Sequence, residues 1–444
     1  MSGSLSTYKE LQESGVNWLG AIPSRWVVAK TGWYFKIAMG QTILKEELID
    51  DGKWPVFSAT DGDHYFGRVD NPTVRLNIGD IVIPARGNSI GSVKLVKEQA
   101  TTTQTTIYCK RESQKLLPEF VFHYLKGCKD NLFYFTQTAI PQITVEEVSS
   151  NPILIPPLEE QKQIASFLDY ETAKIDALIA MQQQLIALLG EKRQAVISHA
   201  VTKGLNPDAP MRDSGVQWLG QVPEHWDVRA ISKCITKITN GYVGPTRDIL
   251  VEEGVPYIQA THIKNGVVNF DNAYFVRQEW SDKKLKSILK AGDVLIVQTG
   301  AGTGDVGLVS ENEAGYNCHA LILLTSSANS MTGSYLSLAL QSEYGKAVLF
   351  SIRTGGMHPH LNCGEVKFVR VPVPPLPEQA AIANHVAEQT KTFDQLEAKA
   401  NAAVELLRER RTALISAAVT GKIDVRGWKP PAADPKKETE MEVA

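Results

Sequence analysis

The sequence predicts an α+β protein in which two mixed α/β domains are separated by a long antiparallel coiled coil of two helices. Three observations lead to this prediction. Two blocks of the chain occur twice, two long segments carry apolar residues at heptad spacing, and the segments between them alternate short apolar runs with glycine, asparagine and proline. A chain of 444 residues also exceeds what one hydrophobic core usually organises. We therefore expect at least two globular units.

The first duplicated block is short and contains tryptophan. Residues 14–20 read SGVNWLG and are followed by Trp26, and residues 214–220 read SGVQWLG and are followed by Trp226. Agreement at rare residues over such a stretch indicates an internal repeat.

The second duplicated block is much longer. PPLEEQ at 156–161 returns as PPLPEQ at 374–379, and the two copies stay in register as far as the Ala-Val-Thr segments that end at Thr202 and Thr420. Between the repeated blocks lie two segments that resemble each other only loosely. The order along the chain is therefore variable, constant, variable, constant.

These boundaries predict the domain organisation. In chain order we expect an N-terminal segment near the end of the second helix, a mixed domain, a long helix, the repeated Trp-Leu-Gly segment, a second mixed domain, a second long helix and a disordered tail rich in Pro, Lys and Glu. In the same order, the limits of these seven segments are 1–26, 27–155, 156–203, 204–226, 227–373, 374–421 and 429–444.

The long constant segments are predicted to be helices that cover each other. The first has no internal proline after Leu158, and both begin with proline and acidic residues and end near glycine, at Gly204 and Gly421. Each carries one apolar stripe, which has to be covered by another surface. The alternative is that each helix packs on its neighbouring domain. The predicted interface residues are Leu168, Ile175, Leu178, Leu185, Leu189 and Val196 in the first helix, and Val386, Phe393, Leu396, Leu407 and Leu414 in the second.

The relative direction of the two helices follows from the distance that a variable domain can span. A helix of about 40 residues is roughly 60 Å long, whereas a compact domain of about 150 residues has a radius of gyration near 15 Å. The second variable domain therefore returns the chain near the point where the first helix ended. We expect an antiparallel pair with an approximate two-fold axis, and an N-terminus beside the end of the second helix. The arrangement would be pseudo-circular.

Composition excludes some classes of protein and restricts others. The net charge of −3 and a pI near 6.3 mean that any binding to nucleic acid is local or depends on a partner. No apolar run approaches the length of a membrane span, and the N-terminus does not resemble a signal peptide, so we expect a cytoplasmic protein without membrane contact. The five scattered cysteines fit buried free thiols.

Several polar residues in the variable domains could face DNA. Arginine and lysine pair with guanine edges or phosphates, and asparagine and glutamine pair with adenine edges. For each residue a plain solvated surface role is the alternative. The candidates are Arg68, Arg75, Arg86, Asn88 and Lys94 in the first domain, and Arg247, His262, Lys264, Gln298, Thr303 and Arg353 in the second.

No convincing catalytic site or metal site is predicted. Gly302, Gly304 and Gly307 match G-x-G-x-x-G and resemble the cofactor loop of S-adenosylmethionine methyltransferases, but no helix is predicted after them, and a β-turn is favoured. His358 and His360 have no further ligand at suitable spacing, so a turn is favoured there as well.

The alternating arrangement resembles the specificity subunit of Type I restriction-modification systems. The marks of this resemblance are the two P-P-L-x-E-Q blocks, the helix turns around Arg193 and Arg411, and the Trp-Leu-Gly blocks. It implies that each variable domain is a target-recognition domain for one half of a bipartite, asymmetric site in double-stranded DNA. It also implies that the helices set the spacing between the half-sites and dock two modification subunits.

The resemblance implies that this chain holds no cofactor and no catalytic residue. S-adenosylmethionine is expected on the modification subunits, and ATP with Mg²⁺ on the translocating restriction subunits. Three other functions remain open from the residues alone: a stand-alone regulator with tandem DNA-binding domains, an S-adenosylmethionine-dependent methyltransferase, and a scaffold without a role in nucleic-acid binding.

Overall fold

The computed structural model describes residues 6–60, 62, 64–133, 141–270, 274–355 and 359–430. The chain divides into two compact units, residues 1–182 with 402–444 and residues 183–401. Each unit contains one mixed domain, part of each long helix and one copy of the tryptophan-containing block. The predicted tail, 429–444, lies outside the described residues from position 431 onward.

Between its first and last strands, the mixed domain of the first unit contains two sheets and three short helices. The larger sheet has the order β4-β10-β7-β8 with antiparallel neighbours, and the smaller has the order β6-β5-β9, in which β5 and β9 are parallel. Phe120 and Tyr124 of α1 are fully buried in the core. The elements are β4 (Phe35–Met39), β5 (Trp54–Phe57), β6 (Gly67–Val69), β7 (Ile81–Pro84), β8 (Lys94–Leu95), β9 (Thr101–Thr102), β10 (Thr106–Arg111), α1 (Pro118–Gly127), α2 (Lys129–Leu132) and α3 (Val145–Ser150), with 3-10 turns η1 (Thr31–Trp33) and η2 (Lys45–Glu47).

The second unit repeats this topology with additions. Its larger sheet has the order β15-β24-β21-β22-β19-β18 and its smaller sheet the order β16-β20-β17-β23. The strands are β15 (Ile235–Asn240), β16 (Leu250–Val251), β17 (Val255–Ile258), β18 (Ile263–Lys264), β19 (Gly266–Val268), β20 (Tyr274–Val276), β21 (Val294–Val297), β22 (Val306–Leu308), β23 (Asn317–Cys318) and β24 (Leu321–Ser326). The helices are α5 (Gln278–Asp282), α6 (Gly333–Gln341), α7 (Glu343–Ser351) and α8 (Cys363–Val366), with 3-10 turns η3 (Ile231–Lys233), η4 (Ala260–His262) and η5 (Leu285–Ser287).

The two domains share a common core of equivalent strands. The row β4-β10-β7-β8 corresponds to β15-β24-β21-β22, and in each smaller sheet one strand has an antiparallel and a parallel neighbour. The duplication therefore includes the variable segments, although their sequences show it only weakly.

Each domain begins and ends at the same place. In the first domain β3 (Val27–Lys30) pairs antiparallel with β11 (Pro152–Ile155), and in the second β14 (Asp227–Ala230) pairs with β25 (Arg370–Val373). The first and last strands of a domain are thus hydrogen-bonded neighbours. This pairing is the physical reason why each domain returns the chain to the point where it left.

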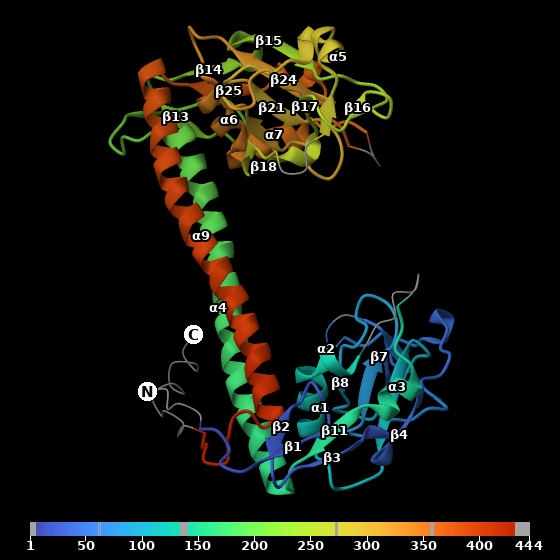
Figure 1. Cartoon of the computed structure of the whole chain (residues 1–444). Coiled ribbons are helices and arrows are strands. Elements are labelled where there is room, and N and C mark those ends of the chain that lie inside the picture. The colour runs from blue at the N-terminus through green and yellow to red at the C-terminus, as the bar shows by residue number, and fades with distance from the viewer. Residues whose placement is uncertain are drawn as a thin grey trace. The chain divides into compact units, whose positions relative to one another are not determined.

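The tryptophan-containing block forms a small hairpin in both units. The first copy pairs β1 (Leu11–Glu13) with β2 (Ala21–Pro23), and the second pairs β12 (Met211–Asp213) with β13 (Gln221–Pro223). Figure 1 shows the first hairpin beside the end of α9 (Leu376–Val419). Asp424, which follows α9, donates its backbone N–H to the Ser6 carbonyl at 2.7 Å. The beginning and the end of the described chain are therefore joined by a hydrogen bond, as the pseudo-circular prediction requires.

The long helices α4 (Leu158–Lys203) and α9 pack antiparallel. At a rise of ~1.5 Å per residue α4 is about 69 Å long. In the first unit Asp176 of α4 is paired with Arg411 of α9, and in the second unit Arg193 of α4 is paired with Asp394 of α9. From the first ion pair to the second, the residue number rises along α4 and falls along α9 by the same amount, as an antiparallel arrangement requires. The two pairs are equivalent in the repeat.

Burial shows which positions of the helices face inward. The predicted residues Leu168, Ile175 and Leu189 are buried, as are Val386 and Phe393. Val196, Leu407 and Leu414 are half-buried, whereas Leu178, Leu185 and Leu396 are each 41% exposed. The inner row passes instead through Ile179 and Ile186, which are half-buried, and through polar positions such as Thr172 and Arg193. These inner residues alternate at spacings of three and four, as in a coiled coil.

A buried glutamine holds each domain on the start of its helix. Gln161, which has no exposed surface, accepts from the Leu117 N–H and donates to the Lys115 and Pro156 carbonyls, all at 2.8 Å. Gln379 repeats this pattern: it accepts from the Thr332 N–H at 2.8 Å and donates to the Ser330 and Pro374 carbonyls at 2.9 Å. The glutamine of each P-P-L-x-E-Q block therefore satisfies three backbone groups that would otherwise be unpaired.

Candidate nucleic-acid interface

Several loops of the first domain meet where its two sheets join. The turn between β9 and β10 crosses from the smaller sheet to the larger one, and it is hydrogen-bonded to three other loops. Gly40 donates to the Thr106 carbonyl at 3.0 Å, Ala85 to the Thr105 carbonyl at 2.9 Å, and Thr103 to the Phe57 carbonyl at 2.9 Å. The loops after β4, β5 and β7 therefore converge on one edge of the domain.

The second domain builds the same edge. Gly241 donates to the Leu321 carbonyl and His319 to the Ile258 carbonyl, both at 2.8 Å, and Ala320 donates to the Tyr242 carbonyl at 2.9 Å. We call this convergence of loops the loop edge of each domain. Connecting loops held by a rigid scaffold are the usual position of binding residues.

A glycine is required at the equivalent position of both loop edges. A Cβ on Gly40 would lie 2.2 Å from the Thr103 carbonyl oxygen, and a Cβ on Gly241 would lie 2.7 Å from the Cys318 carbonyl oxygen. A side chain is therefore excluded directly after β4 and directly after β15, where the chain contacts the turn that crosses between the two sheets. The next residue in each domain, Gln41 or Tyr242, forms a parallel bridge with Thr103 or His319 respectively.

The structure separates the candidates of the first domain into anchored and exposed residues. Arg68 donates to the Gly52 carbonyl at 2.6 Å, and Lys94 is 1% exposed with its ammonium 2.8 Å from the Thr60 carbonyl. Arg75 is exposed and lies over the Trp54 ring at 5.3 Å. Arg86 and Asn88 are exposed in the loop after β7, on the loop edge. The ammonium group of Lys94 is therefore used inside the domain and does not face solvent.

In the second domain two candidates are buried. His262 is 4% exposed, with Nδ1 accepting from the Gln259 N–H at 2.9 Å, and Thr303 is 3% exposed, with its hydroxyl donating to the Gly300 carbonyl at 2.6 Å. Both stabilise turns of the loop edge rather than face solvent. Arg353 is half-buried and donates to the Thr303 carbonyl.

The remaining candidates of the second domain reach solvent. Arg247 and Lys264 are exposed, and Gln298 is half-buried at the start of the loop after β21. Arg247 lies in the loop after β15, and Gln298 follows Val297, which pairs with Leu321 at the loop edge. Lys264 lies on β18, which has no equivalent strand among the described residues of the first domain.

Sequence reasoning missed an aromatic cluster at the second loop edge. The Tyr257 hydroxyl lies 3.1 Å from Nδ1 of His319, and Trp280 contacts Tyr242 and Tyr257 edge-on. Burial lowers the pKa of His319, partly opposed by its contact with the Tyr242 carbonyl, and burial raises the pKa of Tyr257. Both shifts favour the neutral forms of the imidazole and the phenol. These residues are far apart in the sequence, so no local pattern could have revealed them.

The glycine-rich segment is a turn between strands. The strand β22 follows Asp305 directly, and Val297 and Gly304 close the turn with a 2.9 Å hydrogen bond. The helix that a dinucleotide or S-adenosylmethionine loop requires is therefore replaced by a strand. Burial raises the pKa of Asp305, and nearby Lys346 and Arg353 oppose this effect.

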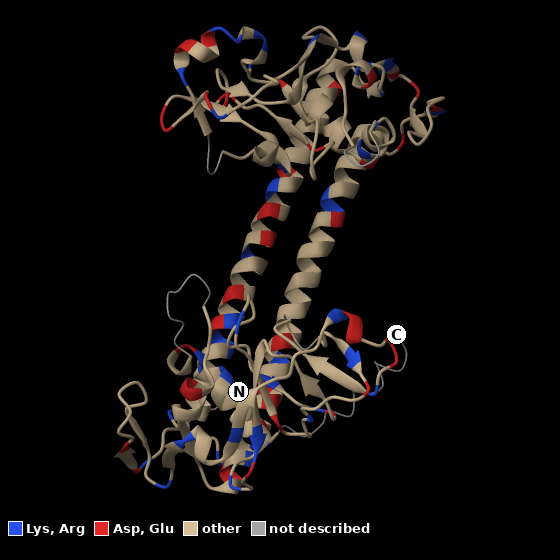
Figure 2. Cartoon of the chain, turned by 90° about the vertical axis from the view of Figure 1, so that its right-hand side faces the viewer, with Lys and Arg blue, Asp and Glu red and all other residues tan. Residues whose placement is uncertain are grey.

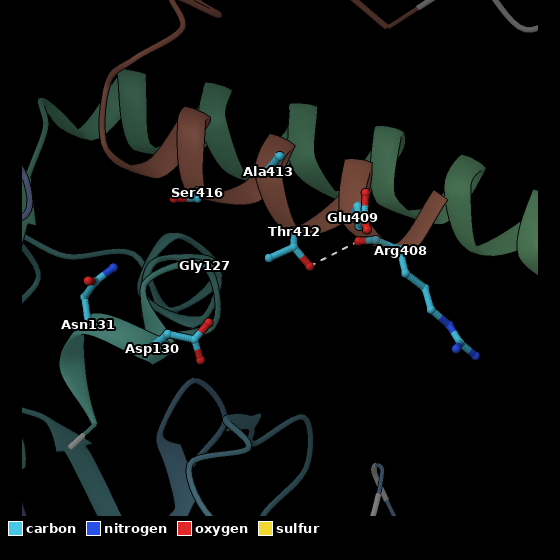
Figure 3. Close-up of a pocket in the computed structure, with 8 residues that line it drawn as sticks. All are labelled: Gly127, Asp130, Asn131, Arg408, Glu409, Thr412, Ala413 and Ser416. Atoms are coloured by element: carbon cyan, nitrogen blue, oxygen red, sulfur yellow. Dashed lines mark hydrogen bonds between the residues drawn. The ribbon is translucent and has the colours of Figure 1, made fainter. Parts of the chain in front are cut away.

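A cleft lies beside α9 in the first unit. It has a volume of about 520 Å³ and is lined by the end of α1, by α2 and by the last third of α9. Figure 3 shows Asp130 and Asn131 on one side and Thr412 and Arg408 on the other, with the Arg408 side chain directed away from Asp130. It is open to solvent, unlike an enclosed small-molecule pocket.

Charges of both signs are interspersed. Figure 2 shows Lys and Arg alternating with Asp and Glu along the long helices and over each domain. Within the described residues no group of three or more His, Cys, Asp or Glu could hold a metal ion, and His358 lies outside them. Among the helices that the structure describes, none combines the length and the hydropathy of a membrane span.

The fold defines an internally duplicated protein in which each unit contains a mixed domain with a loop edge and parts of both long helices. The family model described as "Type I restriction modification DNA specificity domain" matches residues 23–188 and 223–406. The chain is 24% identical to the Type I restriction enzyme MjaVIII specificity subunit of Methanocaldococcus jannaschii over 91% of this chain and 94% of that one. It is also 24% identical to the Type I restriction enzyme EcoBI specificity subunit of Escherichia coli, over 96% and 91% of the two chains.

A solved structure agrees with the fold. One chain, from work on complex assembly and conformational transition of the type I R-M system, superposes with a TM-score of 0.67 at 15% identity and covers 90% of this chain and 98% of that one. The family match covers most of the sequence and occurs twice. This chain belongs to the Type I restriction-modification DNA specificity family and carries two specificity domains in tandem.

Proposed function

We propose that this chain is the DNA-recognition subunit of a Type I restriction-modification complex and that each domain reads one half of a bipartite, asymmetric site through its loop edge. This proposal rests on one observation. The two loop edges share the same backbone arrangement but carry different side chains. Dimeric DNA-binding proteins recognise two identical half-sites with two identical domains. Two domains with the same fold but different side chains would by the same geometry recognise two different half-sites.

The helix pair sets the spacing between the half-sites. Each helix connects to a domain through a buried glutamine, Gln161 or Gln379, so a change in helix length is transmitted to the domain. The ion pairs Asp176–Arg411 and Arg193–Asp394 keep the helices in one antiparallel register.

The helices also dock two modification subunits. In the first unit Leu178 and Leu406 are 41% and 66% exposed, and in the second unit Leu396 and Leu188 are 41% and 52% exposed. These residues occupy the same two positions of the repeat. Exposed apolar residues repeated in this way fit two copies of one partner.

The partners supply the chemistry. Modification subunits bring S-adenosylmethionine and methylate adenine, and restriction subunits bring ATP with Mg²⁺, translocation and cleavage. This chain contributes no catalytic residue, and the complex acts in the cytoplasm. The negative net charge fits this division, because partner subunits supply much of the positive surface around the duplex.

Genome-wide detection of methylated adenine tests the proposal. The chain is co-expressed with its modification subunits in a host without other adenine methylation, and the subunits without this chain are the control. We expect methylation at one bipartite, asymmetric motif only when the chain is present. An absence of methylation, or methylation at a continuous palindrome, would contradict the proposal, and methyl transfer by the purified chain alone would contradict the non-catalytic role.

A further inference from the structure

The loop between β7 and β8 and the loop between β21 and β22 have the same backbone. In the first domain Gly91 donates to the Pro84 carbonyl at 2.8 Å, and in the second Gly304 donates to the Val297 carbonyl at 2.9 Å. These bonds close both loops at the same distance from the preceding strand. We call residues 85–92 and 298–305 the tip loops.

The interior of the two tip loops also agrees. Each loop contains two further turn hydrogen bonds. Each also contains two glycines at equivalent positions with positive φ, a backbone conformation that other residues rarely adopt. The bonds are Ile90 to Gly87 at 3.2 Å and Ser92 to Ser89 at 2.9 Å in the first loop, and Thr303 to Gly300 at 3.1 Å and Asp305 to Gly302 at 2.8 Å in the second. The φ values are 81° at Gly87, 71° at Gly91, 94° at Gly300 and 96° at Gly304.

Each tip loop is held rigidly at its base. The Ala85 carbonyl accepts from the Ile143 N–H and the Gln298 carbonyl accepts from the Leu361 N–H, both at 3.0 Å. In the second domain Arg353 adds a bond to the Thr303 carbonyl. A loop fixed in this way loses little conformational entropy when its tip binds.

The tips carry different exposed side chains. The first presents Arg86 and Asn88, and the second presents Thr299 and Ala301 at the equivalent positions. Over the described part of the chain the side chains of Arg86 and Asn88 form no hydrogen bond or ion pair, whereas the guanidinium groups of Arg68 and Arg353 are held by backbone carbonyls. The donors of Arg86 and Asn88 thus remain available for a ligand.

We infer that the tip loops are equivalent base-reading elements, and that Arg86 and Asn88 select bases in one half-site whereas Thr299 and Ala301 select bases in the other. Arginine pairs bidentately with guanine O6 and N7, and asparagine with adenine N6 and N7. The threonine methyl and alanine contact the methyl group of thymine. This inference rests on the proposed function and deepens it by naming the residues that specify bases.

The test compares methylated motifs of complexes that differ at one tip residue. Arg86→Ala, co-expressed with the modification subunits, should lose roughly 5- to 150-fold of its discrimination at one base pair of one half-site. The other half-site and the spacing should not change. Arg25→Ala, which removes another exposed arginine from the same unit, is the matched control and should leave the motif intact.

A gain-of-function variant keeps the inference testable if Arg86→Ala fails to fold. Thr299→Arg should add a preference for guanine at one position of the second half-site. A wild-type complex that methylates no bipartite motif would overturn the proposed function. A wild-type complex with a bipartite motif that stays the same in folded Arg86→Ala, or in Thr299→Arg, would overturn this inference alone.

Discussion

Arg411 of α9 forms a two-point ion pair with Asp176 of α4, with Nε 2.8 Å from Oδ1 and the terminal guanidinium nitrogen 3.1 Å from Oδ2. Arg411 takes an inner position of the helix pair, where a leucine would be expected to give more stability. Arg193 does the same in the second unit and pairs with Asp394. Polar residues at inner positions specify helix register and orientation at some expense of stability.

Reversing one charge of this pair should weaken the helix packing of the first unit. We expect Asp176→Arg to lower the free energy of unfolding by about 1 kcal/mol, because the carboxylate is half exposed and solvent screens the pair. Combining it with Arg411→Asp should restore most of the loss. A double-mutant cycle measured by urea unfolding, with amide exchange of peptides around 170–182, would show the coupling, and purely additive effects would refute it.

Removing the buried glutamine should loosen the first domain from its helix. Gln161→Leu leaves the Leu117 N–H and two carbonyls unpaired in the interior, and we expect a loss of about 2–4 kcal/mol. Amide exchange should rise around the start of α1, while peptides around Thr332 in the second unit keep their protection. Gln184→Leu, at an exposed position of α4, is the control. Equal effects of the two variants would argue against the clamp.

The segment after α9 should contribute stability that depends on pH. The hydrogen bond from Arg426 holds the pKa of Asp424 below its ordinary value of 3.8, and burial opposes this effect. Because the folded pKa is the lower one, the contribution is present in full at neutral pH and is lost as the pH falls through the folded pKa. Asp424→Asn should therefore lower the urea midpoint at pH 7 more than at about pH 2.5, which lies below the ordinary pKa of the carboxyl group. A difference that is constant with pH would contradict this assignment.

Opening the chain elsewhere should leave a functional protein. The bond from Asp424 to Ser6 places the two ends of the described chain together, and residues 205–208 form an exposed turn after α4. A circular permutant that links the original ends through a short flexible segment and begins at Asn206 should fold and support methylation of the same motif. Permutation within α4, beginning at Gln184, is the control that should fail. A changed motif in the first permutant would refute the pseudo-circular arrangement.

Much of the fold was predictable because repeated rare residues survive where the chain is constrained. The Trp-Leu-Gly hairpins and the P-P-L-x-E-Q helix starts serve the same contacts in both units, so their sequences stay alike. The apolar stripe was only partly located. The heptad pattern predicts Leu178 and Leu185 as interface residues, but the neighbouring Ile179 and Ile186 lie nearer the inner row. Polar inner residues such as Arg193 cannot be recognised from a pattern of apolar residues.

The candidate site was harder to predict because identical residue types serve different purposes. Lys94 and Thr303 have the chemistry of DNA-contacting residues, but their polar groups are used inside the loop edges. The equivalence of the tip loops was invisible in the sequence, since Arg86-Gly87-Asn88 and Thr299-Gly300-Ala301 share one glycine. Backbone hydrogen bonds carry that equivalence.

Lengthening both helices is the most direct test of the central claim. One heptad is inserted between Gln184 and Leu185 of α4 and one between Ala402 and Ala403 of α9, which extends the pair by about 10 Å, or roughly three base-pair steps. Methylome sequencing of cells that co-express this variant with the modification subunits should show the same two half-sites separated by a longer gap. Altered half-sites with an unchanged gap would contradict the account.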